Sequence, residues 1–223
     1  MTDLHTHILP GMDDGAQTVE QSLQMLRAEQ EQGVETVLLT PHFYRTSENV
    51  DMFLERRQQA WQILQAALPE KHPKLLLGAE VAWYQTILQE KRLHELCLEG
   101  TNCILLELPY APWPSMVMDH LYEFSVVTGI TPILAHVDRY LPLQNKAVIE
   151  QLFSIGLPMQ INAPALLHPL RRGKAVRMLK QGKWYIGSDC HDMNQRKPCL
   201  SAAVEVLKKR IPEERLQTML YWP

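Results

Sequence analysis

Short runs typical of β-strands alternate along this chain with longer segments whose apolar residues have helical spacing. The predicted strands cover residues 2–8, 35–40, 74–81, 103–108, 131–135, 157–162 and 183–188. The predicted helices cover residues 19–32, 50–68, 86–98, 115–128, 143–155 and 164–181, and residues 200–223 are expected to form one or two closing helices. Strands joined by helical crossovers run parallel to one another. The sequence therefore predicts an α/β fold with a parallel sheet or barrel.

The composition is that of an ordinary globular protein with one domain. Of the 223 residues, 46% are hydrophobic and 21% are charged, which excludes a disordered or low-complexity chain. No shift in composition marks a linker, so we expect a single domain over residues 1–223. The formal net charge is −3, and no run of like charge is longer than residues 208–210. Nucleic-acid binding is therefore not expected.

Nothing in the sequence is typical of a secreted or membrane-spanning protein. The four cysteines form no C-x-x-C pair, and Asp3, His5 and His7 interrupt the first residues where a secretory leader would be apolar. The longest uncharged apolar-rich stretch, residues 124–137, is shorter than the roughly 18 to 20 residues that a membrane helix needs. We expect a cytoplasmic protein that does not insert into a membrane.

Polar side chains gather at the ends of the predicted strands. Asp3, His5 and His7 belong to the first strand, His42 follows the second, Glu80 lies in the third, Glu107 in the fourth, His136 after the fifth, and Asp189 and His191 after the seventh. The carboxyl ends of parallel strands lie on one rim of a sheet or barrel, where active sites are formed. Six strand ends therefore bring polar residues to one place.

The residue types on this rim are typical of a metal site. Residues i and i+2 of a strand point to the same side, so His5 and His7 converge, as do Asp189 and His191. The two glutamates stand in apolar runs, where a buried carboxylate needs a positive partner. The other four histidines lie on helices or in loops and are expected to have no such role: His72, His94, His120 and His168.

Two further aspartates follow the turn at Gly11. Asp13 and Asp14 precede Gly15 in a loop that can fold back over the rim. One of them could be an additional metal ligand, or the pair could cap the helix that follows. The spacing leaves both alternatives open.

Together these motifs resemble those of the polymerase-and-histidinol-phosphatase (PHP) superfamily. They are D-x-H-x-H at residues 3–7, the single His42, Glu80 and Glu107, H-x-x-R-Y at residues 136–140 and D-x-H at residues 189–191. Within the superfamily, H-I-x-x-x-x-D-D-G at residues 7–15 and the arginine five residues after the last histidine resemble the bacterial capsule-type manganese-dependent protein-tyrosine phosphatases. The resemblance covers essentially the whole chain. It implies a distorted seven-stranded (β/α)7 TIM-like barrel of the PHP type, in agreement with the seven predicted strands.

The resemblance also implies which residues bind metal and substrate. His5, His7, Glu80 and Asp189 would hold one ion, Glu80, Glu107 and His136 a second, and Asp14, His42 and His191 a third. By position, Asp14 rather than Asp13 would be the ligand. Arg139 and Arg196 would bind the phosphate and act in catalysis.

The predicted cofactor is two to three divalent metal ions. Imidazole and carboxylate ligands without a thiolate suit manganese, iron or zinc better than magnesium, and the resemblance favours Mn²⁺. Two ions would neutralise the four carboxylates, and a third ion would make the site positive, which favours an anionic phosphomonoester as substrate. Our hypothesis is that a hydroxide bridging two ions attacks phosphorus without a phosphoenzyme intermediate.

Two aromatic residues, Tyr110 and Trp113, lie in the proline-rich loop after the fourth predicted strand. Their rings could stack on the phenyl ring of phosphotyrosine. Alternatively, the loop is a proline-stiffened turn that packs its own aromatic side chains. The sequence leaves both alternatives open.

A competing motif overlaps the last strand end. Cys190 and Arg196 have the C-x5-R spacing of cysteine-dependent phosphatases. The residues between them include no glycine to form a phosphate-binding loop, and strand alternation turns Cys190 away from the side of Asp189 and His191. We therefore predict a metal-dependent reaction rather than a thiolate nucleophile.

The resemblance implies a phosphotyrosine protein as substrate. By analogy, this would be the tail of a bacterial tyrosine autokinase in capsule or exopolysaccharide biosynthesis. One alternative is a small phosphomonoesterase of the histidinol-phosphatase kind. Another is a nuclease proofreading module, which the charge balance does not support. The last is a non-catalytic adaptor, stabilised by metal, that binds a kinase tail.

Overall fold

The computed structural model describes residues 1–222, and every strand pair in it is parallel. The strands are β1 (Thr2–Thr6), β2 (Thr36–Leu39), β3 (His42–Phe43), β4 (Lys74–Leu77), β5 (Glu80–Ala82), β6 (Cys103–Glu107), β7 (Thr131–Leu134), β8 (Met159–Asn162) and β9 (Trp184–Gly187). They form a sheet in the order β1-β2-β4 and a second sheet in the order β3-β5-β6-β7-β8-β9. The prediction of a parallel α/β fold is confirmed.

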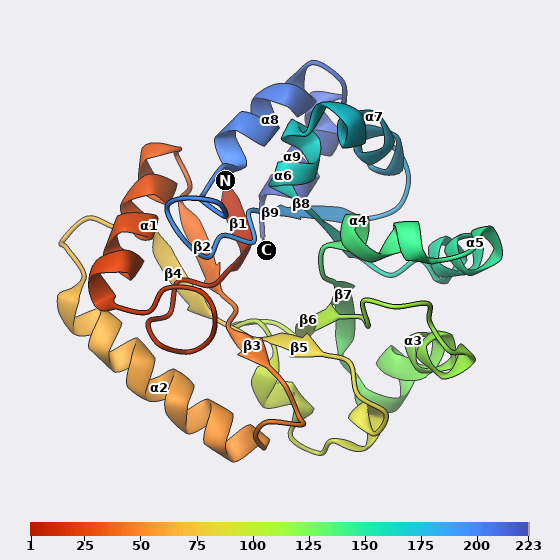
Figure 1. Ribbon diagram of the computed structural model, residues 1–223, viewed down its shortest axis with the longest axis horizontal. Helices are drawn as coiled ribbons and strands as arrows, with labels where there is room; N and C mark the ends of the chain where they lie inside the picture. Colours follow the sequence, from red (N-terminus) through yellow and green to blue (C-terminus); the bar gives the residue numbers. More distant parts are fainter. Residues whose placement is uncertain (223) are drawn as a thin grey trace.

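Backbone hydrogen bonds connect the two sheets. The His7 amide donates to the carbonyl of Cys190 (2.9 Å), and the Asp189 amide donates to the carbonyl of His5 (2.8 Å), so the ends of β1 and β9 lie side by side. On the other side the chain itself joins the sheets, because β3 follows β2 and β5 follows β4 after two residues each, and within the second sheet the Glu80 amide donates to the carbonyl of Pro41 (3.0 Å). Figure 1 shows the strands around the centre of the molecule, with the helices outside them.

The predicted strand at residues 74–81 is divided into β4 and β5, and β3 lies beyond the predicted strand at residues 35–40, so the structure has nine short strands in place of the seven expected. The chain leaves β2 at Pro41, which has no amide to donate, and β3 follows at once. Between β4 and β5 lies Gly78, where a Cβ would come 2.6 Å from Leu98 Cδ2. Close packing at Gly78 therefore interrupts a strand that the apolar pattern alone predicts as continuous, and the missing donor at Pro41 separates β2 from β3.

The helices follow the expected alternation in most places. The α-helices are α1 (Val19–Glu31), α2 (Val50–Ala67), α3 (Ser115–Thr128), α4 (Val137–Tyr140), α5 (Lys146–Ile155), α6 (Ala163–Leu167), α7 (Pro169–Met178), α8 (Leu200–Lys208) and α9 (Glu213–Leu220). Three short 3₁₀ turns are η1 (Ile87–Gln89), η2 (Leu93–Leu96) and η3 (Leu141–Leu143). Side-chain caps begin α1 and α2: Thr18 accepts from the Gln21 amide, and Asn49 accepts from the Met52 amide.

The predicted helix at residues 86–98 is wrong, because η1 and η2 occupy this segment. Ile87, Leu93 and Leu96 are buried, and Arg92 between the two turns pairs with Asp51 of α2 and with Glu95 of η2. Tertiary contacts override helix propensity here. The predicted helix at residues 164–181 is divided at His168, because the residue before Pro169 is disfavoured in helical geometry and has ψ 121°.

A small apolar cluster lies inside the ring of strands, beneath the polar rim. It takes one side chain each from β1, β2, β6, β7 and β9: Leu4, Leu38, Leu105, Ile133 and Tyr185. Leu105 and Glu107 are two residues apart on β6 and share a face. The interior is therefore apolar below and carries carboxylate and imidazole groups at the rim.

Candidate metal and phosphate site

The structure brings all nine predicted metal ligands together at the carboxyl ends of the strands. We call them the rim cluster: His5, His7, Asp14, His42, Glu80, Glu107, His136, Asp189 and His191. The Nε2 atoms of His5 and His7 lie 3.0 Å apart at the end of β1. They lie 3.0 and 3.3 Å from Glu80 Oε2, and 3.7 and 3.5 Å from Asp189 Oδ1. These atoms converge on one point.

Glu80 is the centre of the rim cluster. It begins β5 opposite His42 in the register of β3, and His42 Nδ1 lies 3.0 Å from Glu80 Oε2. The other oxygen, Oε1, lies 2.7 Å from His136 Nε2. Burial opposes ionisation of Glu80, but the surrounding imidazoles, first His5 and His42, outweigh it and hold its pKa well below the usual value. The carboxylate is therefore ionised and shared among several rings.

The remaining ligands extend the cluster on two sides of Glu80. Glu107 Oε1 lies 3.5 Å from His136 Nε2. Asp14 Oδ1 lies 3.6 Å from His42 Nε2 and 3.3 Å from His191 Nε2. Three groups have ligand atoms close enough to hold one ion each: His7, Asp14, His42 and His191; His5, His7 and Glu80; and His42, Glu80 and Glu107. His7 and His42 thus stand between the ion positions that the resemblance implies.

Two of the rim residues have a strained backbone. His136 (φ 28°) and Asp189 (φ 54°) are the non-glycine residues with positive φ in residues 1–222. Left-handed geometry is unfavourable for both residue types, and it persists where surrounding contacts enforce it. Here the Asp189 amide is held by the carbonyl of His5, and the His136 amide donates to Gln160 Oε1. The fold holds both side chains toward the cluster at this cost.

The donor set fits divalent cations. Three buried ligand atoms have no hydrogen-bond partner among the described residues: His42 Nδ1, Glu80 Oε2 and His191 Nε2. Two imidazole nitrogens at 3.0 Å are also closer than unshared lone pairs tolerate unless a proton or cation lies between them. Imidazole with carboxylate is a typical ligand set for manganese, iron or zinc. The residues present therefore fit a site for such ions.

Neighbouring carboxylates favour protonation of two imidazoles in the rim cluster, and burial disfavours it in a third. Burial lowers the pKa of His7, but its hydrogen bonds with Asp13 and Glu80 outweigh burial and raise the pKa to about 10. The pKa of His136 is raised to about 10 in the same way, by Glu107 and Glu80 against burial. Burial and the neighbouring His7 lower the pKa of His191 to about 4. Metal ions bound by these rings would displace protons.

The two aspartates of the loop after Gly11 make different contacts in the structure. His7 Nδ1 donates to Asp13 Oδ2 (2.7 Å), and the His42 amide donates to the same oxygen (2.9 Å). The cap of α1 is Thr18, so neither aspartate takes that role. Asp13 orients His7, and Asp14 faces the cluster. Gly15 allows this loop to close, since a Cβ there would lie 2.1 Å from the carbonyl oxygen of His7.

Two functional residues on β8 are missing from the sequence-based prediction. Gln160 Oε1 lies 3.4 Å from His5 Nδ1, and Gln160 Nε2 donates to Asn162 Oδ1 (2.8 Å). Asn162 Nδ2 donates in turn to Asp189 Oδ2 (2.7 Å). The signal for them is the spacing: two amide side chains at i and i+2 in a wholly buried strand share a face. Such second-layer hydrogen bonds fix the orientation of ligands.

Arg139 and Arg196 flank Asp189 at the mouth of the cluster. Arg196 Nη2 donates to Asp189 Oδ1 (2.7 Å), and Arg139 Nη1 lies 3.5 Å from Asp189 Oδ2. Arg196 Nη1 also lies 3.7 Å from Asp14 Oδ2. Both arginines line a cavity of about 330 Å³ that Asn162 and Asp189 also line, and we call it the phosphate cavity for the anion that its arginines could bind. An anion in this cavity would meet two guanidinium groups beside the rim cluster.

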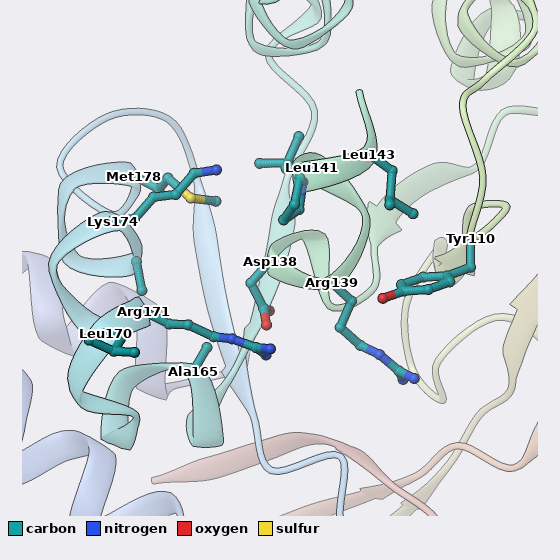
Figure 2. A pocket seen from close by; sticks show the side chains of 12 residues that line it. Tyr110, Asp138, Arg139, Leu141, Leu143, Ala165, Leu170, Arg171, Lys174 and Met178 are labelled. Carbon is teal, nitrogen blue, oxygen red and sulfur yellow. The ribbon is translucent and has the colours of Figure 1, made fainter. Parts of the chain in front are cut away.

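The two aromatic residues of the proline-rich loop are separated. Trp113 is 8% exposed, its indole N–H donates to the carbonyl of Pro109 (2.9 Å), and its ring packs edge-on against Tyr140. Trp113 therefore packs inside the protein, as in the alternative of a proline-stiffened turn that packs its own aromatic side chains. Tyr110 is 70% exposed and lines a second cavity, together with Arg139 (Figure 2).

Cys190 faces away from the phosphate cavity. Its side chain is fully buried, and its Sγ lies 3.8 Å from Glu29 Oε1 on α1. Burial, with Glu29 and Asp3 nearby, raises the pKa of this thiol well above the usual value. The geometry gives no support to a thiolate nucleophile beside Arg196.

Comparison with known proteins gives one consistent family. A family model described as "Capsular polysaccharide synthesis, CpsB/CapC" matches residues 1–222. Tyrosine-protein phosphatase CpsB of Streptococcus agalactiae is 26% identical over 96% of this chain and 93% of its own. Tyrosine-protein phosphatase YwqE of Bacillus subtilis is 28% identical over 96% of this chain and 86% of its own. None of the helices in residues 1–222 is long and apolar enough to cross a membrane.

Solved structures give the same result. A crystal structure described as that of YwqE from Bacillus subtilis and CpsB from Streptococcus pneumoniae, "unique metal-dependent tyrosine phosphatases", superposes with a TM-score of 0.81. It is 25% identical and covers 98% of this chain and 91% of that one. An organophosphorus hydrolase variant from Deinococcus radiodurans has a TM-score of 0.52 at 14% identity over 98% of this chain and 89% of that one, and so shares the fold alone.

Proposed function

Because the chain belongs to the CpsB/CapC family, we propose that it is a metal-dependent protein-tyrosine phosphatase, a phosphoric monoester hydrolase. Family membership confirms the resemblance found in the sequence. Relatives that match nearly the whole chain are named tyrosine-protein phosphatases, and one structure is described as metal-dependent. The observation that carries the proposal is the rim cluster, in which buried imidazoles and carboxylates converge beside two arginines.

The proposed metal ligands are those of the rim cluster, with two to three divalent ions and Mn²⁺ as the favoured ion. His5, His7, Glu80 and Asp189 would hold one ion, Glu80, Glu107 and His136 a second, and Asp14, His42 and His191 a third. The distances of 2.7 to 3.7 Å between these ligand atoms support the assignment. When bound, such ions supply Lewis-acid stabilisation of phosphate charge and a water of lowered pKa.

The side chains around the ions have separate roles in this proposal. Arg139 and Arg196 bind phosphate oxygens and stabilise the charge that develops on them during transfer. Asp13, Gln160 and Asn162 hold the ligands in place, because each bonds to a cluster residue. Tyr110, exposed beside Arg139, lies against the phenyl ring of the substrate. We assign no substrate contact to the buried Trp113.

We further propose that the strands act as one distorted seven-stranded barrel, with β2 and β3 as one interrupted strand and β4 and β5 as another. The bonds of β1 to the end of β9, and of Pro41 to Glu80, support closure of the ring. Residues 1–223 form one domain in this proposal.

The physiological setting that fits this function is the cytoplasmic side of capsule or exopolysaccharide production. The proposed substrate there is a phosphotyrosine protein, with the tail of a bacterial tyrosine kinase as the first candidate. The family description links the chain to capsular polysaccharide synthesis, and this link supports the choice.

A substrate panel tests the function. The purified protein, loaded with Mn²⁺, would be assayed for phosphate release from a phosphotyrosine peptide, the matched phosphoserine peptide and histidinol phosphate. We expect rapid release from phosphotyrosine alone. Preference for histidinol phosphate would favour a small phosphomonoesterase, and tight binding of the phosphotyrosine peptide without release would favour a non-catalytic adaptor. Either result would contradict the proposed function.

A further inference from the structure

A second cavity opens beside the phosphate site. It has a volume of about 420 Å³ and lies between α7 on one side and the segments around Tyr110 and η3 on the other (Figure 2). Its apolar lining includes Leu141 and Leu143 of η3, Leu170 and Met178 of α7, and Ala165 of α6. We call it the side cavity. Its walls come from the loops that follow β6, β7 and β8, on the rim where the site lies.

The side cavity adjoins the phosphate cavity. Asp138, Arg139, Ala165 and Arg171 line both of them. A chain segment attached to a group held by Arg139 and Arg196 would therefore begin beside the side cavity.

Large apolar side chains around the side cavity are left exposed. Leu170 is 90% exposed, Tyr110 is 70% exposed and Leu143 is 38% exposed. A single exposed leucine is ordinary on a protein surface, but apolar side chains that ring one cavity are typical of a binding surface. The side cavity can thus bury an apolar side chain of a partner.

Unpaired positive charge lies on the same wall. Helix α7 carries four basic residues and no acidic one: Arg171, Arg172, Lys174 and Arg177. Arg172 donates to the carbonyls of Leu166 and Leu167. Arg171 and Lys174 line the cavity and take part in none of the ion pairs formed in residues 1–222. Because the chain as a whole has a net charge of −3, this basic wall is a local feature that favours an acidic partner.

We propose that the side cavity binds the segment of the protein substrate next to its phosphotyrosine, with an apolar side chain inside the cavity and acidic side chains on Arg171 and Lys174. This proposal rests on the proposed function, because the phosphotyrosine tethers the segment. The four lining residues that the side cavity shares with the phosphate cavity favour this occupant, since a segment tethered next door binds at high effective concentration. The side cavity then selects among phosphotyrosine proteins, and the rim cluster performs the reaction.

Two phosphotyrosine peptides and free phosphotyrosine test the proposal. One peptide carries leucine and glutamates beside the phosphotyrosine, and the other carries serine and lysines at the same positions. In the protein with wild-type sequence, we expect kcat/KM to be about tenfold higher for the acidic, apolar peptide, mainly through KM. Equal values for the two peptides, or a preference for the basic peptide, would overturn the proposal.

The variant pair for this test changes charge equally in two places. Lys174→Glu alters the wall of the side cavity at a residue that does not line the phosphate cavity, and Lys180→Glu makes the same change on an exposed residue that lines neither cavity. We expect the first variant to reduce the preference and to keep its kcat/KM for free phosphotyrosine within about twofold. The second should behave like the wild-type protein. The proposal would be overturned if both variants lost the peptide preference equally, or if kcat/KM fell as much for free phosphotyrosine as for the peptides.

A separate substitution tests the apolar part. Leu170→Ser should reduce the advantage of leucine over serine in otherwise identical acidic peptides, with no effect on free phosphotyrosine. Because Leu170 is 90% exposed, the substitution leaves the core intact. An unchanged leucine preference would count against an apolar side chain in the cavity. If the wild-type protein hydrolyses neither peptide nor free phosphotyrosine, the proposed function itself is wrong, a result distinct from activity without preference.

Discussion

The rim cluster and the side cavity lie next to each other, but most side chains of the rim cluster are buried and hydrogen-bonded, whereas large side chains of the side cavity are exposed. Most ligands of the rim cluster are buried and have further partners behind them, such as Asp13 behind His7 and Asn162 behind Asp189. In the side cavity, Tyr110 and Leu170 are exposed and unsupported. Chemistry on phosphate needs fixed positions, whereas recognition of a peptide tolerates mobile side chains. Substitutions in the two regions should therefore differ in size and in substrate dependence.

The largest effect is expected at Glu80, whose two oxygens face four histidines of the rim cluster. Glu80→Gln should lower phosphotyrosine hydrolysis by about 10³-fold for every substrate, because it removes a buried charge that several ions would share. Metal content, measured by mass spectrometry on the purified protein, should fall in parallel. Glu123→Gln, on the exposed side of α3, is the matched control. Full metal content and activity in Glu80→Gln would refute the proposed ligand set.

A smaller loss of metal affinity and activity is expected at Asp13, which bonds to the ligand His7 and is not itself a proposed ligand. Asp13→Asn keeps the shape of the side chain but weakens its bond to His7 Nδ1. Loss of such an orienting carboxylate typically costs about 10 to 100-fold in metal affinity or activity. Titration of the metal-free protein with Mn²⁺ measures the change, and Asp119→Asn on α3 serves as control. An unaltered Mn²⁺ affinity would mean that Asp13 does not support the cluster.

In the side cavity, the effect should be modest and confined to aromatic or peptide substrates. Tyr110→Ala should lower kcat/KM for phosphotyrosine peptides by roughly fivefold, since a stacked ring pair contributes about 1 kcal/mol. Release of phosphate from an alkyl phosphate should be unchanged. Tyr122→Ala, half-exposed on α3, removes a ring elsewhere and should have no effect. A uniform loss for alkyl and aryl phosphates would contradict the assigned role of Tyr110.

The smallest effect on activity, and a distinct one on stability, is expected at Glu29. Burial, and then the neighbouring Asp3, raise the pKa of Glu29 well above its ordinary 4.5, so the folded protein keeps a proton that the unfolded chain releases. This contribution to stability is complete below the ordinary pKa and is lost as pH rises toward the folded-state pKa. Glu29→Gln should therefore make the free energy of unfolding less dependent on pH at pH values above the ordinary 4.5. Urea unfolding at several pH values measures this, and an unchanged slope would contradict it.

The sequence predicts the rim cluster well because its signal is local and strong. Spacing at i and i+2 places His5 with His7, and carboxylates in apolar runs mark Glu80 and Glu107. The parallel strand order then brings distant positions together without further information. The residues that hydrogen-bond to the ligands are harder to predict from the sequence. Gln160 and Asn162 are uncharged, and no single residue of their strand is unusual.

Other features depend on tertiary packing and so could not be predicted from local pattern. Residues 86–98 have helical composition, yet Arg92 bonds outward and the segment forms two turns. Tyr110 and Trp113 share one loop, and only the position of Tyr140 decides that Trp113 is buried against it. The choice between Asp13 and Asp14 depends on how the loop folds over His7, which Gly15 permits.

The most direct test of the central claim compares chelation with thiol alkylation in one assay. Hydrolysis of a phosphotyrosine peptide would be measured after EDTA treatment, after readdition of Mn²⁺, and after iodoacetamide treatment of the loaded protein. The metal-dependent site predicts that EDTA abolishes hydrolysis, that Mn²⁺ restores it, and that alkylation has no effect, because Cys190 is buried and faces Glu29. Loss of activity on alkylation, with full activity after chelation, would contradict the account.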